Sequence, residues 1–207
     1  MGNYTTYGFY PQVCYQDPSK LCWFTQFKST YARTAFPCLD EPSFKAIWDL
    51  QIIRPDYYHA RTNYPLLETV SLPDKPGYVL DIFGPSGPPM SSYLVAVAIT
   101  DYTSLPSGDN STTVWAPLGE LDDGRGDFAN EIGPELMSYY EDYFKAGYPL
   151  AKQDLMYAAN KPGYGMENWG LVLFAPNCLM VDNNTTQEDK WNIINVVAHE
   201  LAHQVSK

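Results

Sequence analysis

Residues 196–207 read VVAHELAHQVSK, and they place His199 and His203 four positions apart with Glu200 directly after the first histidine. On a helix, side chains four residues apart share one face about one turn from each other, which is the spacing needed to hold one metal ion. Zinc bound there lowers the pKa of a bound water, and a neighbouring carboxylate accepts the proton. We therefore expect His199 and His203 to be zinc ligands and Glu200 to be a general base.

The residues before this motif predict the helix that carries it. Residues 186–189 (TQED) are a polar helix start with acids in the first turn, and Ile193, Val197 and Leu201 then recur every four residues as a buried stripe. Catalytic zinc takes three protein ligands and keeps one position for water, whereas this segment supplies two. His59 is the remaining histidine, but a lone histidine far from the motif is more often a surface or turn residue than a ligand.

A second motif lies upstream, at residues 163–174, which read GYGMENWGLVLF. The three glycines indicate bent backbone that leads into an apolar strand at 171–174. Glu167 stands at the edge of that strand, where its carboxylate can pair with the ammonium group of a substrate. An acid beside glycines is usually a solvated loop residue, so the prediction depends on the metal motif that follows.

The two motifs together resemble the M1 family of zinc aminopeptidases, the gluzincin group that includes aminopeptidase N. Other stretches resemble the family in the same order along the chain: FTQF at 24–27, ARTAFPCLDEPSFKA at 32–46, MSSYLVAVAITDY at 90–102 and YYEDYFKAGYPLAKQDL at 139–155. The resemblance implies one Zn²⁺ per complete site and cleavage of N-terminal residues from peptides.

The resemblance also implies roles for seven residues of this chain. They are His199 and His203 as zinc ligands, Glu200 as general base, Glu167 as the group that binds a free amino terminus, Gly165 and Met166 beside the substrate backbone, and Gln26 in the first specificity pocket. An acid that holds the ammonium group at a fixed distance from the metal places only the first peptide bond over the activated water. The expected partners are therefore peptides with a free amino terminus.

The chain also departs from the family pattern. The family completes its zinc site with a glutamate on the following helix and carries a tyrosine farther on that stabilises the oxyanion, and both positions lie beyond Lys207. We therefore expect a fragment cut at both ends that is inactive alone. Tyr164 replaces a common glycine and Lys28 a common glutamine, so a non-catalytic ectodomain that binds a partner is the alternative. A different reaction at the same site, either epoxide hydrolysis or endopeptidase cleavage, is a further alternative.

The expected fold is α+β with two partial domains. Residues 1–106 contain apolar segments at 46–53, 77–83 and 92–99 separated by Pro and Gly, which predict strands of a β-rich, sandwich-like or saddle-like domain. By resemblance this is the C-terminal part of the M1 N-terminal domain. Residues 107–207 are expected to begin a thermolysin-like catalytic domain.

Within the second region, apolar residues recur every four positions from 128 to 144 and predict an amphipathic helix, ended by Gly147 and Pro149. Pro134 lies inside it and predicts either a kink or the first turn. Strands are expected at 154–158 and 171–174, before the metal-binding helix.

Composition excludes some classes of function. A formal net charge of −11 argues against nucleic-acid binding, which needs a basic face. No stretch of about 20 apolar residues is present to span a membrane, and the first residues do not resemble a signal peptide. The negative net charge either attracts cationic peptides or only increases the solubility of the protein.

Several features agree with an extracellular protein or a cell-surface ectodomain whose parent is membrane-anchored. Glycosylation sequons begin at Asn3, Asn110, Asn183 and Asn184, which predict a glycoprotein. Cys14 and Cys22 bracket a short polar turn and form either a local disulfide or two thiols. Cys38 and Cys178 fit buried thiols as well as they fit disulfide partners.

Overall fold

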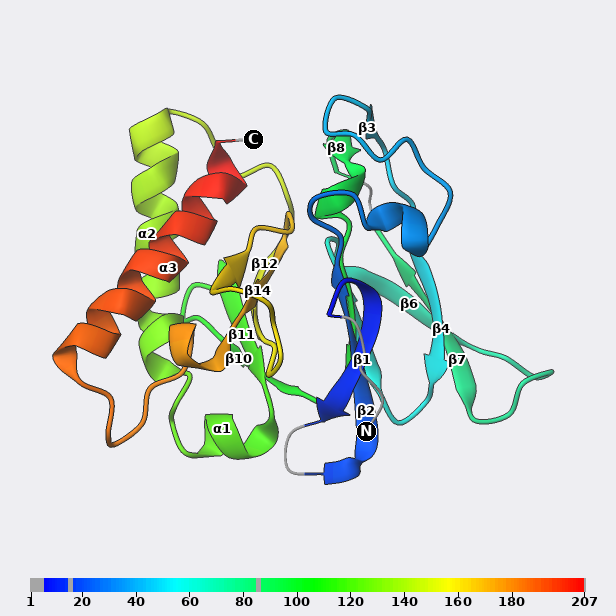
Figure 1. The fold of residues 1–207 in the computed structure, drawn as a ribbon, viewed down its shortest axis with the longest axis horizontal. Helices are drawn as coiled ribbons and strands as arrows, with labels where there is room; N and C mark the ends of the chain where they lie inside the picture. Colours follow the sequence, from blue (N-terminus) through cyan, green and yellow to red (C-terminus); the bar gives the residue numbers. More distant parts are fainter. Residues whose placement is uncertain (1–5, 15–16, 85–86, 207) are drawn as a thin grey trace. The chain divides into compact units, whose positions relative to one another are not determined.

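The computed structural model describes residues 6–14, 17–84 and 87–206. The chain forms two compact units, Met1–Asp101 and Tyr102–Lys207 (Figure 1). The first is built of strands and short 3₁₀ turns, and the second combines a sheet with helices. The predicted α+β class, with a β-rich region before a mixed region, is confirmed.

The first unit contains three antiparallel sheets among its described residues. The largest has the order β1-β2-β9-β5, the next β4-β7-β6, and the smallest pairs β3 with β8. Their bounds are Gly8–Cys14 (β1), Asp17–Gln26 (β2), Lys45–Ala46 (β3), Gln51–Pro55 (β4), His59–Thr62 (β5), Leu66–Ser71 (β6), Tyr78–Phe83 (β7), Met90–Ser91 (β8) and Val97–Thr100 (β9). Two 3₁₀ turns, Ala32–Thr34 (η1) and Ser92–Leu94 (η2), lie between strands.

Cys14 and Cys22 form a disulfide between β1 and β2, which decides between the two alternatives. Cys38 and Cys178 are free thiols, the first half-buried and the second buried. The expected strand at 77–83 is confirmed by β7.

The other two strand predictions in this unit are wrong in part. Residues 46–53 do not form one strand, because β3 ends at Ala46 and β4 begins at Gln51 in a different sheet. Between them the indole Nε1 of Trp48 donates to the carbonyl of Met90, 3.0 Å away. Residues 92–99 are largely buried as expected, but they begin with the turn η2, so the strand β9 starts only at Val97.

The turn at η2 is fixed by Asp40, from the PCLDEP stretch. The Asp40 carboxylate is 3% exposed and accepts three hydrogen bonds, from the Arg33 backbone N–H (3.0 Å), the Arg33 Nε (3.2 Å) and the Ser92 hydroxyl (2.7 Å). Burial alone would raise the pKa of Asp40, but these hydrogen bonds to the charged form outweigh it and lower the pKa. Asp40 therefore joins three segments of the first unit as an ionised carboxylate.

Replacing Asp40 by asparagine should lower the free energy of unfolding by about 1–2 kcal/mol at neutral pH, since one hydrogen bond to a charged acceptor is lost and the Arg33 contact is partly screened. Because the folded pKa lies below the unfolded value, this stabilisation is present above about pH 4 and is lost as pH falls through the folded pKa. Urea unfolding from pH 7 to pH 3 measures it. The exposed neighbour Glu41→Gln is the control, and an Asp40→Asn penalty that does not shrink in acid would contradict the assignment.

The second unit is a five-stranded sheet with the order β10-β11-β12-β14-β13. Neighbours among β11, β12 and β14 are parallel, and the two edge strands are antiparallel. The bounds are Thr103–Pro106 (β10), Thr112–Ala116 (β11), Gln153–Tyr157 (β12), Gly165–Met166 (β13) and Leu171–Phe174 (β14). Every residue of β12 and β14 is buried. The sequence of β14 is wholly apolar, as is usual for a strand covered on both faces, whereas β12 begins with Gln153 and Asp154, and Asp154 pairs with Lys152 Nζ (2.6 Å).

Helices Leu118–Asp122 (α1), Asp127–Phe144 (α2) and Gln187–Val205 (α3) complete this unit, with a 3₁₀ turn at Pro176–Cys178 (η3). Figure 1 shows α2 and α3 side by side next to the sheet. Within the described part of the chain, no helix is both long enough and apolar enough to cross a membrane. The expected strands at 154–158 and 171–174 correspond to β12 and β14.

The boundary between the units lies before β10 rather than at 106/107. Residues 103–106 pair with β11, so the contacts of β10 belong to the second unit, and the division falls between Asp101 and Tyr102.

The helix expected over 128–144 is confirmed as α2, with Pro134 inside it, but the expected apolar series is not its buried face. The residues spaced by four from Phe128 to Phe144 are half-buried or exposed, whereas Ala129, Gly133 and Met137 are buried. Small residues explain this face: a Cβ added at Gly133 would lie 3.0 Å from the Thr112 hydroxyl on β11, so the helix approaches the sheet closely there.

Candidate metal and substrate site

The helix α3 begins with a capping box. The Thr186 hydroxyl accepts the Asp189 backbone N–H (3.1 Å), and the Asp189 carboxylate accepts the Thr186 backbone N–H (2.9 Å). The acids of this first turn also suit the positive end of the helix dipole. Ile193, Val197 and Leu201 are fully buried, as predicted.

The two histidines lie together on another face of α3. Their Nε2 atoms are 3.2 Å apart, and their rings are nearly perpendicular. Two nitrogens each 2.0–2.1 Å from one tetrahedral metal ion are about 3.3–3.4 Å apart. The separation of His199 and His203 therefore fits two ligands of a single zinc ion.

Two buried carboxylates adjoin this pair. One ligand atom each from Glu167, Glu200 and His203 lie within 4.8 Å of one another. Glu167 and Glu200 are only 5% and 6% exposed, although they come from separate elements. The structure thus brings four of the seven predicted site residues into one cluster of two imidazoles and two acids.

The backbone of Gly165 lies directly against the side chain of Glu200. A Cβ atom added at Gly165, on β13, would lie 2.5 Å from both Cγ and Cδ of Glu200, closer than real contacts allow. Only glycine leaves room for that carboxylate. Met166 is buried beside it on β13, and the side chain of Tyr164 is 67% exposed.

The remaining candidates lie in the first unit. Gln26 is the last residue of β2 and is buried, and its place in a specificity pocket stays a prediction. Lys28 is exposed, and His59 opens β5 with an exposed side chain. Among the described residues, His59 is in no group of potential metal ligands, and the other such group contains Cys14 and Cys22, whose sulfurs are in the disulfide.

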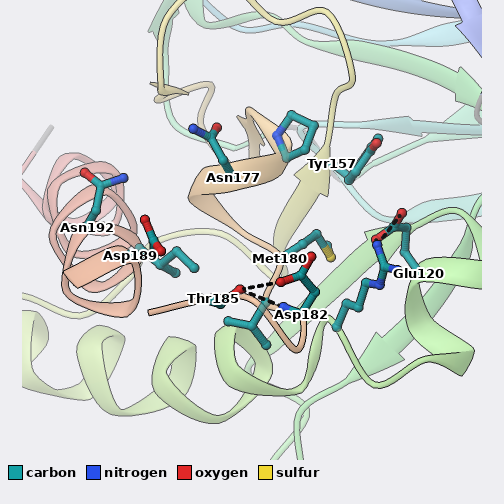
Figure 2. A pocket seen from close by; sticks show the side chains of 12 residues that line it. Glu120, Tyr157, Asn177, Met180, Asp182, Thr185, Asp189 and Asn192 are labelled. Carbon is teal, nitrogen blue, oxygen red and sulfur yellow. Dashed lines mark hydrogen bonds and ion pairs between the residues drawn. The ribbon is translucent and has the colours of Figure 1, made fainter. Parts of the chain in front are cut away.

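A separate cavity of about 260 Å³ lies near the start of α3 (Figure 2). None of the predicted site residues lines it. Its acids already have partners: Glu120 pairs with Arg125 (3.2 Å), Asp182 accepts the Thr185 hydroxyl (3.1 Å), and Asp189 serves the helix cap. We therefore place the candidate site at the histidine face and not in this cavity.

Two family models match the sequence. The Peptidase M1 N-terminal domain matches residues 2–94, and the Peptidase family M1 domain matches residues 128–206. The chain belongs to peptidase family M1.

Curated M1 relatives agree with the match. Human endoplasmic reticulum aminopeptidase 1 is 39% identical over 184 residues, mouse aminopeptidase N 31% over 202, and chicken aminopeptidase Ey 35% over 184. These alignments cover 87%, 95% and 87% of this chain, but 19%, 21% and 19% of the relatives. The chain thus spans about a fifth of the length of these M1 aminopeptidases.

One residue of the site was not predicted from the sequence. Gln204 follows His203 directly and is fully buried against residues 167–170. A glutamine in a helix gives no signal of its own, and the sequence feature that points to Gln204 is its place directly after the histidine motif.

Proposed function

We propose that this M1 segment carries the zinc and substrate groups of an aminopeptidase that releases N-terminal residues from peptides. The observation that carries the proposal is the cluster of His199, His203, Glu200 and Glu167 in one unit. Their spacing suits a metal ion, a base and an acid for the amino terminus. The relatives named aminopeptidase support the same reaction.

In this proposal His199 and His203 hold Zn²⁺ through their Nε2 atoms. Zinc held there supplies Lewis-acid activation of water near neutral pH. Glu200, buried on Gly165, accepts the proton of the attacking water and later delivers it to the leaving amine. Because Gly165 has no side chain, the Glu200 carboxylate has room beside His203.

Glu167 confers the preference for a chain end. Glu167 is 5% exposed, and a buried carboxylate favours a ligand that brings a positive charge, because a buried ion pair with hydrogen bonds offsets the cost of desolvating the acid. The ammonium group of a free amino terminus meets that need. Peptides that lack it would not form this ion pair with Glu167.

The experiment compares L-leucinamide with N-acetyl-L-leucinamide by calorimetry on the zinc-loaded chain. We expect the free amine to bind at least about tenfold more tightly, since one hydrogen-bonded charge contact contributes about 1.5–3 kcal/mol. Glu167→Gln should abolish the preference, while Glu135→Gln, an exposed acid on α2, should preserve it. Equal binding of both ligands by the wild type would sink the proposal.

We also propose a location in the secretory pathway or at the cell surface. The Cys14–Cys22 disulfide supports an oxidising compartment. Of the four asparagines that begin glycosylation sequons, Asn110, Asn183 and Asn184 are exposed, and Asn3 lies outside the described residues.

A further inference from the structure

Gln204 contacts the Glu167 segment at several points from the last turn of α3. Its Oε1 accepts the Gly170 backbone N–H at 2.9 Å, and its backbone carbonyl accepts the Trp169 indole N–H at 2.9 Å. Its Nε2 lies 3.4 Å from the carbonyls of both Glu167 and Glu200. The side chain is fully buried, so one amide group contacts the main chains of both site acids.

These contacts satisfy groups that would otherwise be buried without partners. The carbonyl of Gln204 is among the last four of α3, which have no partner within a helix, and the Trp169 indole supplies one. The Gly170 N–H has its acceptor in Gln204, while the Gly170 carbonyl accepts the Asp154 backbone N–H (3.1 Å) and Lys152 Nζ (2.7 Å). Gly170 is therefore fixed between α3 and β12.

The backbone at Gly170 has a φ of +82°, which L side chains rarely adopt. The turn after Glu167 therefore contains a glycine in a backbone conformation that other residues rarely adopt. The Gln204 amide holds this glycine from the side of α3. Removing the amide would leave the Gly170 N–H without its acceptor on α3, although the Trp169 indole would still donate to the backbone carbonyl of Gln204.

We propose that Gln204 is a positioning residue that sets where Glu167 lies relative to the histidine face. The inference rests on the proposed function, because it concerns the recognition of an amino terminus by Glu167. Gln204 itself touches neither metal nor substrate. It acts through the main chain of residues 167–170, and zinc binding by His199 and His203 does not require it.

The first test is hydrogen exchange at the Gly170 amide, followed by NMR. Gln204→Met keeps the length of the side chain but removes its polar atoms, and we expect Gly170 to exchange at least about tenfold faster. Gln204→Glu keeps an oxygen acceptor and should stay within about threefold of wild type. Gln204→Asn is a second loss-of-contact variant that shortens the side chain, and it replaces Gln204→Met if the latter does not fold.

The second test separates positioning from general loosening of the helix. In Gln204→Met, the affinity for L-leucinamide should fall at least about tenfold, while the affinity for Zn²⁺ alone should stay within about twofold. Ile193→Val removes one buried methylene at the other end of α3, and it should change neither affinity. Equal losses of zinc and amine binding in Gln204→Met would overturn the inference, as would unchanged Gly170 exchange.

The tests distinguish a failure of the proposed function from a failure of this inference alone. If wild type does not prefer L-leucinamide to its acetylated form, the aminopeptidase assignment fails. A Gly170 amide whose exchange still depends on Gln204 would then show only a structural contact, and the positioning role would be overturned as well. If wild type shows the preference and Gln204→Met retains it fully, the inference alone is overturned.

Discussion

Replacing His199 and His203 together by alanine should remove zinc from the protein completely. In the native chain the two Nε2 atoms are 3.2 Å apart, a separation that fits two ligands of one tetrahedral ion, and the double variant loses both of them. We expect about one zinc per wild-type chain after dialysis and none in the double variant, an affinity loss of at least about 100-fold. Elemental analysis of the dialysed proteins measures both.

The matched control is His59→Ala, which removes an exposed histidine of the first unit. It should retain the wild-type zinc content, because His59 is in none of the groups of potential ligands found among the described residues. Zinc that persists in the double variant, or that is lost with His59, would contradict the assignment of the metal to α3.

Introducing a single methyl group at Gly165 should destabilise the second unit and displace Glu200. The added carbon would lie 2.5 Å from Cγ and Cδ of that side chain, and overpacking of a dense interior costs about 1–3 kcal/mol. The backbone at Gly165 does not require glycine for its φ angle, so the whole effect comes from space. The free energy of unfolding in urea measures it.

A double-mutant cycle tests the cause of that loss. Glu200→Ala removes the atoms that clash, so Gly165→Ala should cost little in the Glu200→Ala background, and the coupling energy should account for most of the 1–3 kcal/mol. Gly108→Ala is the control, since a Cβ there meets nothing within 4 Å. Additive losses in the cycle would show that Glu200 does not rest on Gly165.

Local sequence signals predicted much of this site. The spacing of His199 and His203 requires only that the segment be helical, and the cap at Thr186 and the stripe from Ile193 to Leu201 both predict that helix. The strand after Glu167 was equally clear, because it is apolar and bounded by glycine. Such features depend on residues close together in sequence.

The features that sequence reasoning missed depend on distant residues. The turn η2 interrupts an apolar run because the Ser92 hydroxyl binds Asp40, which lies 52 positions earlier. The buried face of α2 is set by how closely Gly133 approaches β11, and a series of large apolar residues every four positions does not show that. Gln204 likewise acquires its role only when Gly170 is folded against it.

The cap of α3 has a consequence for studies of carbohydrate attachment. Thr186 is both the residue that caps α3, the helix that carries His199 and His203, and the hydroxyl residue of the sequon that begins at Asn184. Deleting that sequon through Thr186→Ala would remove a possible sugar chain and uncap the helix at once, so any defect would be credited to the missing sugar in error. Asn184→Gln avoids this, since Asn184 contributes its backbone N–H to the preceding turn, where Asp182 accepts it at 2.8 Å. Glycan-deletion mutants of this chain should therefore be made at asparagine.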